Sequence, residues 1–590
     1  MSKIIRKEQS PTVQDAIAPV NRRSWHMIAA LVAFIVCTLM LTNPIARSSR
    51  LDASPDISMP KNLHPFALPF ITGWGRWLPQ DLHLSSNITL SIYRTANIEI
   101  IVLVALLVAI YLYTLYFVAR RVESEQLKFV RKIVLIGVVV VGLILVVLPG
   151  MASKDIFVYA DYGNILGRHH QNPYFAVPNL VAPHDALTVT DDWNKVSSAY
   201  GPVWSIVTAV ITGILGDHPI FQLYGYRMMG LIYHLINIFL IGLILRSTGR
   251  SERVVTLGMV FYALCPLTLL ESVMGGHNDA FMAVFMLLGI LLTIRAGKRG
   301  FTRPANYIPV LCAFSLATLV KFTSFPLIFI FLIVLAIEAL ELPVLTGSLG
   351  SLNLRSIQLR SLNWREGIKH LLIGGLTCAF MFVLFYGPFF IGHNLGAIAR
   401  SFSLPPSSYE SQNSLMKVAV LYLQGHPGQR GGLPHLVVRV LASHTFWTLL
   451  DASGLSACFL LCAWRSWIAP TARTLVLCSL TAMTALLVLT PWFYSWYVIW
   501  LVSLAATLFA FPMGRWSRTL LVFVSVFSVS SFATYIDVGL LDHQLLFRYL
   551  AMIVPPIVAV LWLWYRMFRV KNAVPQVSTD KVPDASLQNV

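Results

Sequence analysis

Apolar runs dominate the chain and are separated by short polar connections. Most of the runs approach or exceed the roughly 20 apolar residues that cross a bilayer as a helix. The hydrophobic pattern therefore predicts helices at about 26–43, 97–118, 132–149, 201–216, 220–245, 254–272, 279–295, 306–322, 324–341, 370–391, 443–463, 472–490, 496–511, 518–534 and 549–566.

The basic residues assign sides to the connections. By the positive-inside rule, the cytoplasm holds the segments ARRVESEQLKFVRK, RSTGRSER, RAGKRGFTR, RSIQLRSLNWREGIK, WRSWIAPTAR, MGRWSR and YRMFRVK. The same assignment places outside the connections at 44–96, 150–200, 274–279, 392–442, 490–497 and 535–548. Two full crossings between 201 and 245 would place RSTGRSER outside. We therefore expect 201–216 to enter the bilayer without crossing it. We therefore expect about fourteen crossings with both termini in the cytoplasm.

Composition agrees with this pattern. Of 590 residues, 56% are hydrophobic and only 12% are charged, and the mean hydropathy is +0.70. We predict an all-α polytopic membrane protein of the cytoplasmic membrane, with lipids as its surroundings. The net charge of +18 comes from short clusters between apolar runs and forms no continuous basic face, so we expect no nucleic-acid partner.

The domain organisation is simple. We expect a cytoplasmic tail at 1–24, one integral-membrane domain at 25–568 and a disordered cytoplasmic tail at 569–590. The run at 26–43 lacks a small-residue cleavage site and is read as an uncleaved first span. All seven cysteines lie in or beside apolar runs, without the spacing of a disulfide framework or metal site, and are interpreted as core residues.

The first unusual polar segment is SKDIFVYADYGNILGRHHQNPY, which follows an apolar run. Ser153 can cap a helix that begins at Lys154. That helix should end near Gly163 or Gly167, and NPY indicates a turn.

Asp155, Tyr159 and Tyr162 recur at i, i+4 and i+7 on this helix and so share one face. One interpretation is that Asp155 interacts with the helix N-terminus while the tyrosines belong to an interfacial aromatic belt. The other is that Asp155 is a general base at the membrane surface.

A very short outer turn and an interrupted apolar run carry further polar residues. His277, Asn278 and Asp279 lie between two expected spans, where they are either solvated or part of a site. Lys321 interrupts an apolar run and either snorkels to the surface or holds an anionic phosphate.

Aromatic residues gather at the outer ends of the spans. Trp193 and Tyr200 lie in the second half of the 150–200 loop. The segment PWFYSWY contributes Trp492, Tyr494 and Trp496 among its rings. An interfacial belt is one explanation, and walls for a sugar or an isoprenoid are the other.

Five segments, taken in their order and spacing, resemble one known family over roughly positions 130–510. They are SKDIFVYADYGNILGRHHQNPY, DDWNKVSSAYGP, GGHNDA, LVKFTSFP and PWFYSWY. It is the family of bacterial polyprenol-phosphomannose-dependent α(1→6)-mannopyranosyltransferases of the Mpt type. These are integral-membrane glycosyltransferases of the C-type fold (GT-C). YADYGN and the adjacent His169 and His170 depart from the family pattern, so the acceptor and the sugar stay open.

The resemblance implies transfer of a hexose, most simply mannose, from a polyprenyl phosphate donor to a glycan or glycolipid acceptor on the outer face of the membrane. It implies that Asp155 is the catalytic carboxylate, with Lys321 or Arg227 beside the donor phosphate. The candidate substrate-binding residues are Tyr159, Tyr162, Trp193, Tyr200, Arg227, His277, Asn278, Asp279, Lys321, Trp492, Tyr494 and Trp496.

Three alternatives remain. Asp191 and Asp192 could bind a metal, but adjacent loop aspartates are usually solvated, so we expect no metal and no cofactor other than the lipid-linked donor. The same scheme could transfer galactose or arabinose. A transporter or flippase of polyprenyl-linked sugars is the non-enzymatic alternative, for which ionisable residues near the bilayer midplane are typical.

Overall fold

The computed structural model describes residues 22–48, 90–147, 153–185, 187–188, 191, 193–216, 219–341, 363–403, 413–414, 416, 418, 439–441, 443–535 and 544–573. The predicted terminal tails therefore lie almost wholly outside the described residues. The same holds for most of the predicted outer connections at 44–96, 392–442 and 535–548. Helix α23 continues to Ala573, a few residues beyond the predicted start of the C-terminal tail.

All fifteen apolar runs form helices, and the described part of the chain contains no strand. Ten of these helices are long and apolar enough to cross a bilayer. They lie in the elements α3 (Leu90–Arg120), α4 (Leu127–Val147), α9 (Pro219–Ser247), α12 (Asp279–Gly297), α14 (Phe325–Ala339), α15 (Trp364–Phe390), α19 (His444–Ile468), α20 (Ala472–Leu489), α22 (Arg515–Ser530) and α23 (Gln544–Ala573). The predicted all-α polytopic architecture is confirmed.

The remaining runs are shorter or broken. The run predicted at 254–272 is split into α10 (Glu252–Ala263), α11 (Pro266–Leu269) and the π-helical turn η4 (Leu270–Met274), with a bend of 57°. Pro266 begins the second piece, where its missing N–H costs no helical hydrogen bond. The shorter apolar stretches are Trp25–Leu41 within α1 (Arg22–Ser48), α8 (Pro202–Leu215), α13 (Pro304–Val320) and the run of η10 (Ser495–Tyr497), α21 (Val498–Thr507) and η11 (Leu508–Ala510). The number of crossings stays a prediction.

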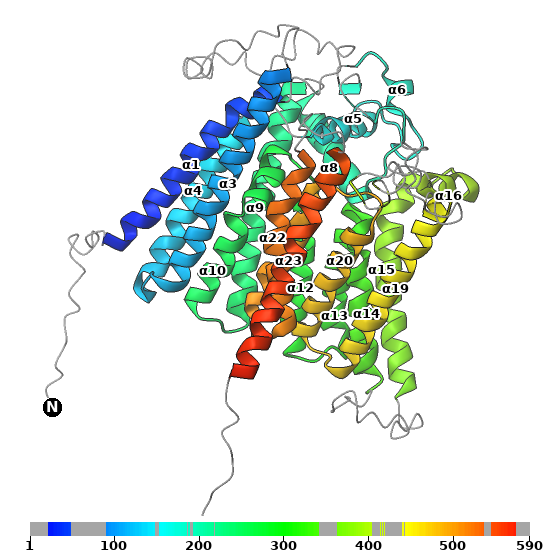
Figure 1. Cartoon of the computed structure of the whole chain (residues 1–590). Coiled ribbons are helices and arrows are strands. Elements are labelled where there is room, and N and C mark those ends of the chain that lie inside the picture. Colours follow the sequence, from blue (N-terminus) through cyan, green and yellow to red (C-terminus); the bar gives the residue numbers. More distant parts are fainter. Residues whose placement is uncertain are drawn as a thin grey trace, which may run out of the picture.

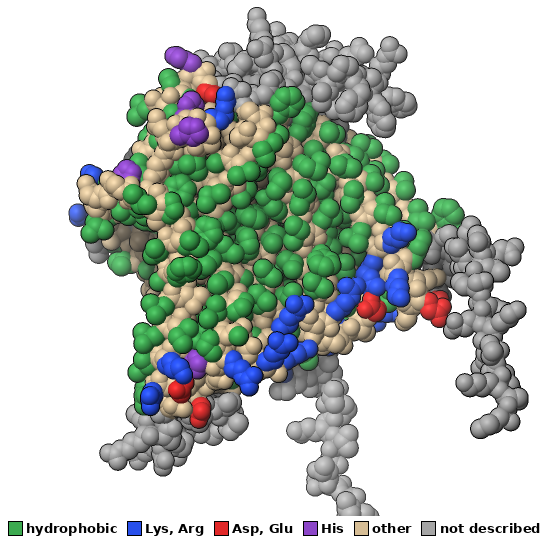
Figure 2. All heavy atoms as spheres, turned by 180° about the vertical axis from the view of Figure 1, so that it is seen from behind, with side chains coloured by type: hydrophobic (Ala, Val, Ile, Leu, Met, Phe, Trp, Pro, Cys, Tyr) green, Lys and Arg blue, Asp and Glu red, His purple; other side chains and the backbone are tan. Residues whose placement is uncertain are grey.

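Basic side chains collect at one end of the helix bundle. Helices α3, α9, α12 and α19 each carry an arginine in the last turn. Arg253 donates to the carbonyl of Ala119 at 3.2 Å, and Lys298 donates to that of Ser247 at 2.6 Å, so these connections lie side by side. Figure 2 shows lysine and arginine along one rim beneath a broad hydrophobic band. This is the distribution expected of a membrane protein with a cytoplasmic basic rim.

The short helices α5 (Asp155–Gly167), α6 (Pro178–Val181), α8 and α16 (Leu395–Ser403) gather at the other end of the bundle (Figure 1). Helix α8 packs along α5 and has 14 residues, so it is about 21 Å long, less than the hydrocarbon core. Gly201, just before α8, brings its backbone so close to α13 that a Cβ would lie 2.0 Å from the carbonyl oxygen of Leu319. The loop before α8 is thus held against the end of α13, which Lys321 follows directly.

The core and the lipid-facing layer are separate. Every residue of α21 is buried, and most of α12 and α13 is buried as well. Helices α15, α19 and α23 are the least buried of the membrane-length helices that the structure describes. They display apolar side chains such as Leu376, Leu460 and Phe568 outward, at 67%, 72% and 66% exposure. These three helices therefore form much of the surface that contacts lipid tails.

The orientation can be tested by cysteine labelling in a cysteine-free background. Leu180, on α6, is 79% exposed, and a Leu180→Cys variant is expected to react with a membrane-impermeant maleimide in intact cells. Arg299 is exposed at the basic rim, and Arg299→Cys should react only after permeabilisation. The reverse pattern would invert the predicted topology.

Candidate active site

Five ionisable side chains from distant parts of the chain meet at the end opposite the basic rim. This group, called here the outer polar cluster, consists of Asp155, Glu271, His277, Asp279 and Lys321. They come from the start of α5, from η4, from the turn before α12, from the first residue of α12 and from the residue after α13. Their charges lie where helices end rather than along the middle of a span.

Asp155 is the first residue of α5, one position later than predicted. The hydroxyl Oγ of Ser153 accepts a hydrogen bond from the Asp155 N–H at 3.2 Å, but the N-cap position is Lys154 rather than the predicted Ser153. Tyr159, one turn on, donates its hydroxyl to Asp155 Oδ2 at 3.3 Å. Tyr162 instead donates to the carbonyl of Val196 at 3.0 Å. Tyr159 therefore contacts Asp155 as the predicted shared face requires, whereas Tyr162 binds the loop between α5 and α8, called here the outer loop.

The charge of Asp155 is stabilised by its neighbours. Its side chain is 20% exposed, and Oδ2 lies 3.7 Å from Nδ1 of His277. Burial alone would raise the pKa of Asp155, but the nearby His277 and the charge of Lys321 outweigh it, and the pKa lies below its ordinary value. Asp155 is therefore an ionised carboxylate at neutral pH, partly open to the outside.

His277 connects two carboxylates. Nε2 lies 3.3 Å from Oε2 of Glu271, while Nδ1 faces Asp155, and the ring is fully buried. Burial lowers the pKa of an imidazole, but the paired carboxylates of Asp155 and Glu271 together raise the pKa of His277 to about 9. His277 is therefore an imidazolium at neutral pH.

Glu271 is the cluster member that the sequence reasoning missed. It is 1% exposed, and its Oε1 accepts hydrogen bonds from Ser495 at 2.9 Å and from Tyr535 at 2.7 Å. It lies inside an apolar run, where an ionisable residue is itself a signal of function.

Two glycines shape the turn that holds His277. A Cβ at Gly275 would lie 2.5 Å from Cδ2 of His277. Gly276 has φ of +58°, which favours glycine. The GGHND sequence thus bends the backbone so that the imidazole turns back toward η4.

Asp279 and Lys321 form the third ion pair of the cluster. The ammonium of Lys321 donates to Asp279 Oδ1 at 2.8 Å, and the indole N–H of Trp500 donates to the same oxygen at 2.6 Å. Lys321 also lies over the ring of Tyr497, 4.2 Å from its centroid. Asp279 is fully buried and the Lys321 side chain is 13% exposed, so the interpretation in which the turn residues are solvated is wrong for Asp279.

The predicted aromatic residues form two groups around the cluster. Tyr494 stacks on Trp496 at 4.3 Å and Trp496 stacks on His277 at 4.1 Å, which places the imidazole at the end of an aromatic stack. Trp193 meets Trp492 edge to face at 5.8 Å. These contacts tie the 490–497 segment both to the outer loop and to the cluster.

Three other predicted residues have different surroundings. Tyr200 packs edge to face on Tyr159 at 5.1 Å and so lies beside Asp155. Arg227 is fully buried and donates to the carbonyls of Met274 and Val146 at 2.9 and 3.3 Å. Asn278 is fully buried, and its side-chain amide makes no hydrogen bond with the part of the chain that the structure describes. Arg227 therefore binds backbone around η4, which leaves Lys321 as the predicted cation that is partly open.

A second group of carboxylates supports the outer loop. Asp161 is fully buried and accepts a hydrogen bond from Thr188 at 2.8 Å, while Asp185 accepts one from Asn164 at 3.0 Å. Burial raises the pKa of Asp161 to about 6. Asp191 is 3% exposed, so the expectation that it is solvated is wrong, and Asp192 lies outside the described residues.

No group of three or more His, Cys, Asp or Glu side chains among the described residues could hold a metal ion. Metal independence nevertheless stays a prediction.

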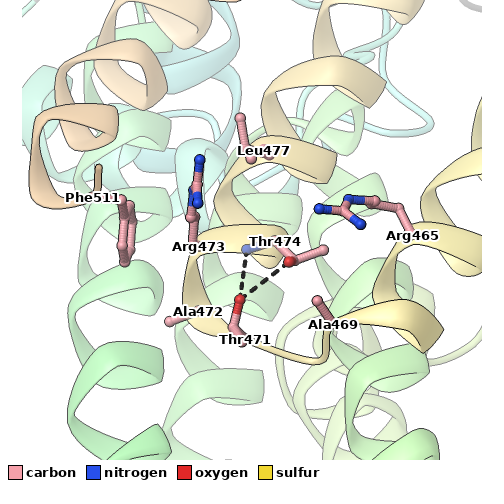
Figure 3. A pocket seen from close by; sticks show the side chains of 8 residues that line it. All are labelled: Arg465, Ala469, Thr471, Ala472, Arg473, Thr474, Leu477 and Phe511. Carbon is pink, nitrogen blue, oxygen red and sulfur yellow. Dashed lines mark hydrogen bonds between the residues drawn. The ribbon is translucent and has the colours of Figure 1, made fainter. Parts of the chain in front are cut away.

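One cavity, of about 440 Å³, lies at the opposite end of α20 from the 490–497 segment. Figure 3 shows Arg465 and Arg473 on its walls together with Thr471, Thr474 and Phe511. It contains no carboxylate, and α20, with 18 residues, separates it from the outer polar cluster by about 27 Å. The cavity therefore offers arginine cations but no carboxylate that could act as a base beside them.

Part of this chain is similar to known proteins. Residues 67–338 match the family described as "Alpha-(1->6)-mannopyranosyltransferase, N-terminal domain". Alpha-(1->6)-mannopyranosyltransferase A of Corynebacterium glutamicum is 24% identical over 145 residues, which are 25% of this chain and 29% of the relative. Alpha-(1->6)-mannopyranosyltransferase B of the same organism is 30% identical over 183 residues, 29% of each chain. Both alignments thus span less than a third of the relatives' length.

Proposed function

We propose that this chain, whose residues 67–338 match the α-(1→6)-mannopyranosyltransferase family, is a membrane mannosyltransferase that uses a polyprenyl phosphate mannose donor. The acceptor is a hydroxyl group of a glycan or glycolipid on the outer face of the cytoplasmic membrane. The observation that carries the proposal is Asp155, an ionised, partly exposed carboxylate that contacts Tyr159 and His277 at the end of the bundle away from the basic rim.

The chemistry needs a base and a cation. Asp155 takes the proton of the acceptor hydroxyl while the oxygen of that hydroxyl attacks the anomeric carbon of the donor sugar. The bond from that carbon to the phosphate oxygen breaks at the same time, with inversion, and the polyprenyl phosphate leaves with the bonding electrons. Lys321 stabilises the negative charge that develops on the phosphate. Its ammonium has three N–H donors, of which Asp279 takes one.

The placement of the charges favours an enzyme over a transporter. A transporter site is expected near the bilayer midplane, between discontinuous helices. Here Asp155, His277 and Lys321 lie at or beyond helix ends. The break between α10 and η4 brings Glu271 to the same end. The discontinuous helix therefore contributes a residue to the outer polar cluster.

The test is transfer by the purified chain in liposomes. Radiolabelled polyprenyl phosphate mannose is supplied with a mannan oligosaccharide or glycolipid acceptor, and we expect label in the acceptor at wild type and almost none with Asp155→Asn. Polyprenyl phosphate galactose and arabinose serve as competing donors. Transfer of galactose or arabinose in place of mannose would change the sugar that we propose but keep the proposed reaction from a polyprenyl phosphate donor. Movement of the intact lipid-linked sugar across the bilayer without transfer would overturn the enzyme proposal.

A further inference from the structure

We propose that Glu271 is a positioning residue that holds His277, as the imidazolium, against Asp155 and so orients the carboxylate that acts on the acceptor. The inference rests on the proposed function for the role of Asp155. It adds a residue that touches neither substrate nor reacting atoms. Glu271, His277 and Asp155 form a continuous line from the inside of the bundle to its outer end.

The two nitrogens of His277 face carboxylate oxygens on opposite sides. A neutral imidazole has one N–H donor and one bare acceptor nitrogen, which would be repelled by whichever carboxylate it faced. Only the imidazolium presents a positive N–H to both carboxylates, with Glu271 Oε2 at 3.3 Å and Asp155 Oδ2 at 3.7 Å, and these contacts are ion pairs rather than aligned hydrogen bonds. Trp496, stacked on the ring at 4.1 Å, keeps it in this plane. The two carboxylates that face the ring therefore favour the protonated form of His277.

Glu271 is itself fixed by helices far away in the sequence. Ser495 in η10 and Tyr535 in η12 (Ser531–Tyr535) both donate to Oε1, which leaves Oε2 for His277. Two hydrogen bonds from neutral donors stabilise a buried carboxylate without neutralising its charge. Glu271 thus supplies a fixed negative charge behind the imidazole.

The effect reaches Asp155 through its Oδ2. Tyr159 and His277 both approach that oxygen, so the carboxylate plane is held from two directions. We assign the transfer of the acceptor proton to Oδ1, the other oxygen. Without Glu271, one of the two charges that keep His277 protonated is lost, and Asp155 loses a fixed partner once the ring is neutral.

Other titratable groups surround the histidine. Asp155 and Tyr159 face it from α5, Asp279 follows it on α12, and Lys321 extends from the end of α13. Tyr494, Tyr497 and Tyr535 belong to the C-terminal elements packed against the cluster. Of the acidic groups, only Asp155 and Glu271 pair with the imidazole in the described structure.

The first measurement reads the ionisation of His277 and needs no activity. Protein labelled with [15N]histidine in liposomes is titrated by solid-state NMR, and the resonances are assigned by their loss in His277→Gln. In wild type we expect the imidazolium below a midpoint near pH 9 and the neutral ring above it. Glu271→Gln should lower that midpoint by about one pH unit or more, since it removes a charge within about 4 Å.

The second measurement is the pH profile of transfer. The imidazolium is present below the midpoint and lost as the pH rises through it, so the wild-type rate should fall on the alkaline side near the same midpoint. With Glu271→Gln this fall should move to lower pH by the shift seen for His277. Glu338→Gln is the matched control, because Glu338 is a half-buried acid on α14 that accepts a hydrogen bond from the backbone N–H of Phe301. It should leave both midpoints unchanged.

Each outcome decides the proposal. A wild-type midpoint at or below the ordinary value of about 6.5, or a Glu271→Gln midpoint equal to that of wild type, would overturn it. If Glu271→Gln does not fold, Glu271→Asp keeps the charge and moves it away from the ring, and a smaller downward shift is expected. An absent transfer activity with the expected NMR shifts would contradict the proposed function while leaving the ion-pair geometry intact.

Discussion

Replacing Asp155 with asparagine is expected to lower the rate of mannosyl transfer by about a hundredfold to ten-thousandfold, the usual effect of removing a positioned base. Asparagine keeps the shape of the side chain and can still accept the hydrogen bond from Tyr159. It cannot take a proton from the acceptor. The loss should therefore appear in kcat, measured with saturating donor in liposomes, while the amount of folded protein stays at the wild-type level.

The control for this variant is Asp185→Asn. Asp185 is another outer carboxylate, half-buried and bonded to Asn164, and it has no contact with the outer polar cluster among the interactions that the structure describes. We expect it to keep activity within about threefold of wild type, as for a surface change outside the chemistry. Equal activity of Asp155→Asn and Asp185→Asn would move the base to Asp279 or Asp161, the next carboxylates to test.

Local hydrophobicity was sufficient to predict the helices. A run of apolar residues must be helical in a bilayer because no water can satisfy its backbone groups, so all fifteen runs became helices whatever their neighbours. The bend between α10 and α11 was not predicted, although Pro266 marks it. It depends on which backbone groups the surrounding helices can satisfy, and the sequence of one run does not contain that information.

The candidate site was predicted in part, for a related reason. Asp155, His277 and Lys321 were found because they interrupt apolar sequence at expected outer ends, and the structure brings them together. Glu271 was missed because it lies within a run, where its partners Ser495 and Tyr535 are more than 220 residues away. Such pairings arise only when the C-terminal helices pack on η4.

Ion pairing also explains why the cluster can be buried. Asp279 is fully buried and is compensated by Lys321 and Trp500, while Glu271 is compensated by His277 and two hydroxyl groups. Removing one partner of a buried pair leaves a charge in a medium of low dielectric. These charged contacts therefore also hold α12, α13 and α21 together at this end of the bundle.

Replacing Lys321 with methionine is expected to have two separable effects. The unpaired Asp279 should destabilise the fold by about 3–5 kcal/mol, as breaking a buried pair does. The loss of a charged hydrogen bond to the donor phosphate should weaken the apparent donor affinity by about tenfold to a hundredfold. Lys321→Arg should keep partial activity, because it retains the charge with a different geometry.

The double variant Lys321→Met/Asp279→Asn separates these effects. It leaves no unpaired charge, and Trp500 can still donate to the amide oxygen, so thermal unfolding in detergent should return close to the wild-type temperature. Donor affinity should remain weak, because the cation is still missing. Lys298→Met serves as the control at the basic rim, where Lys298 binds only the carbonyl of Ser247 among the described contacts, and should alter neither quantity. If the double variant bound the donor as tightly as wild type, Lys321 would serve only to neutralise Asp279, and the phosphate would need another cation.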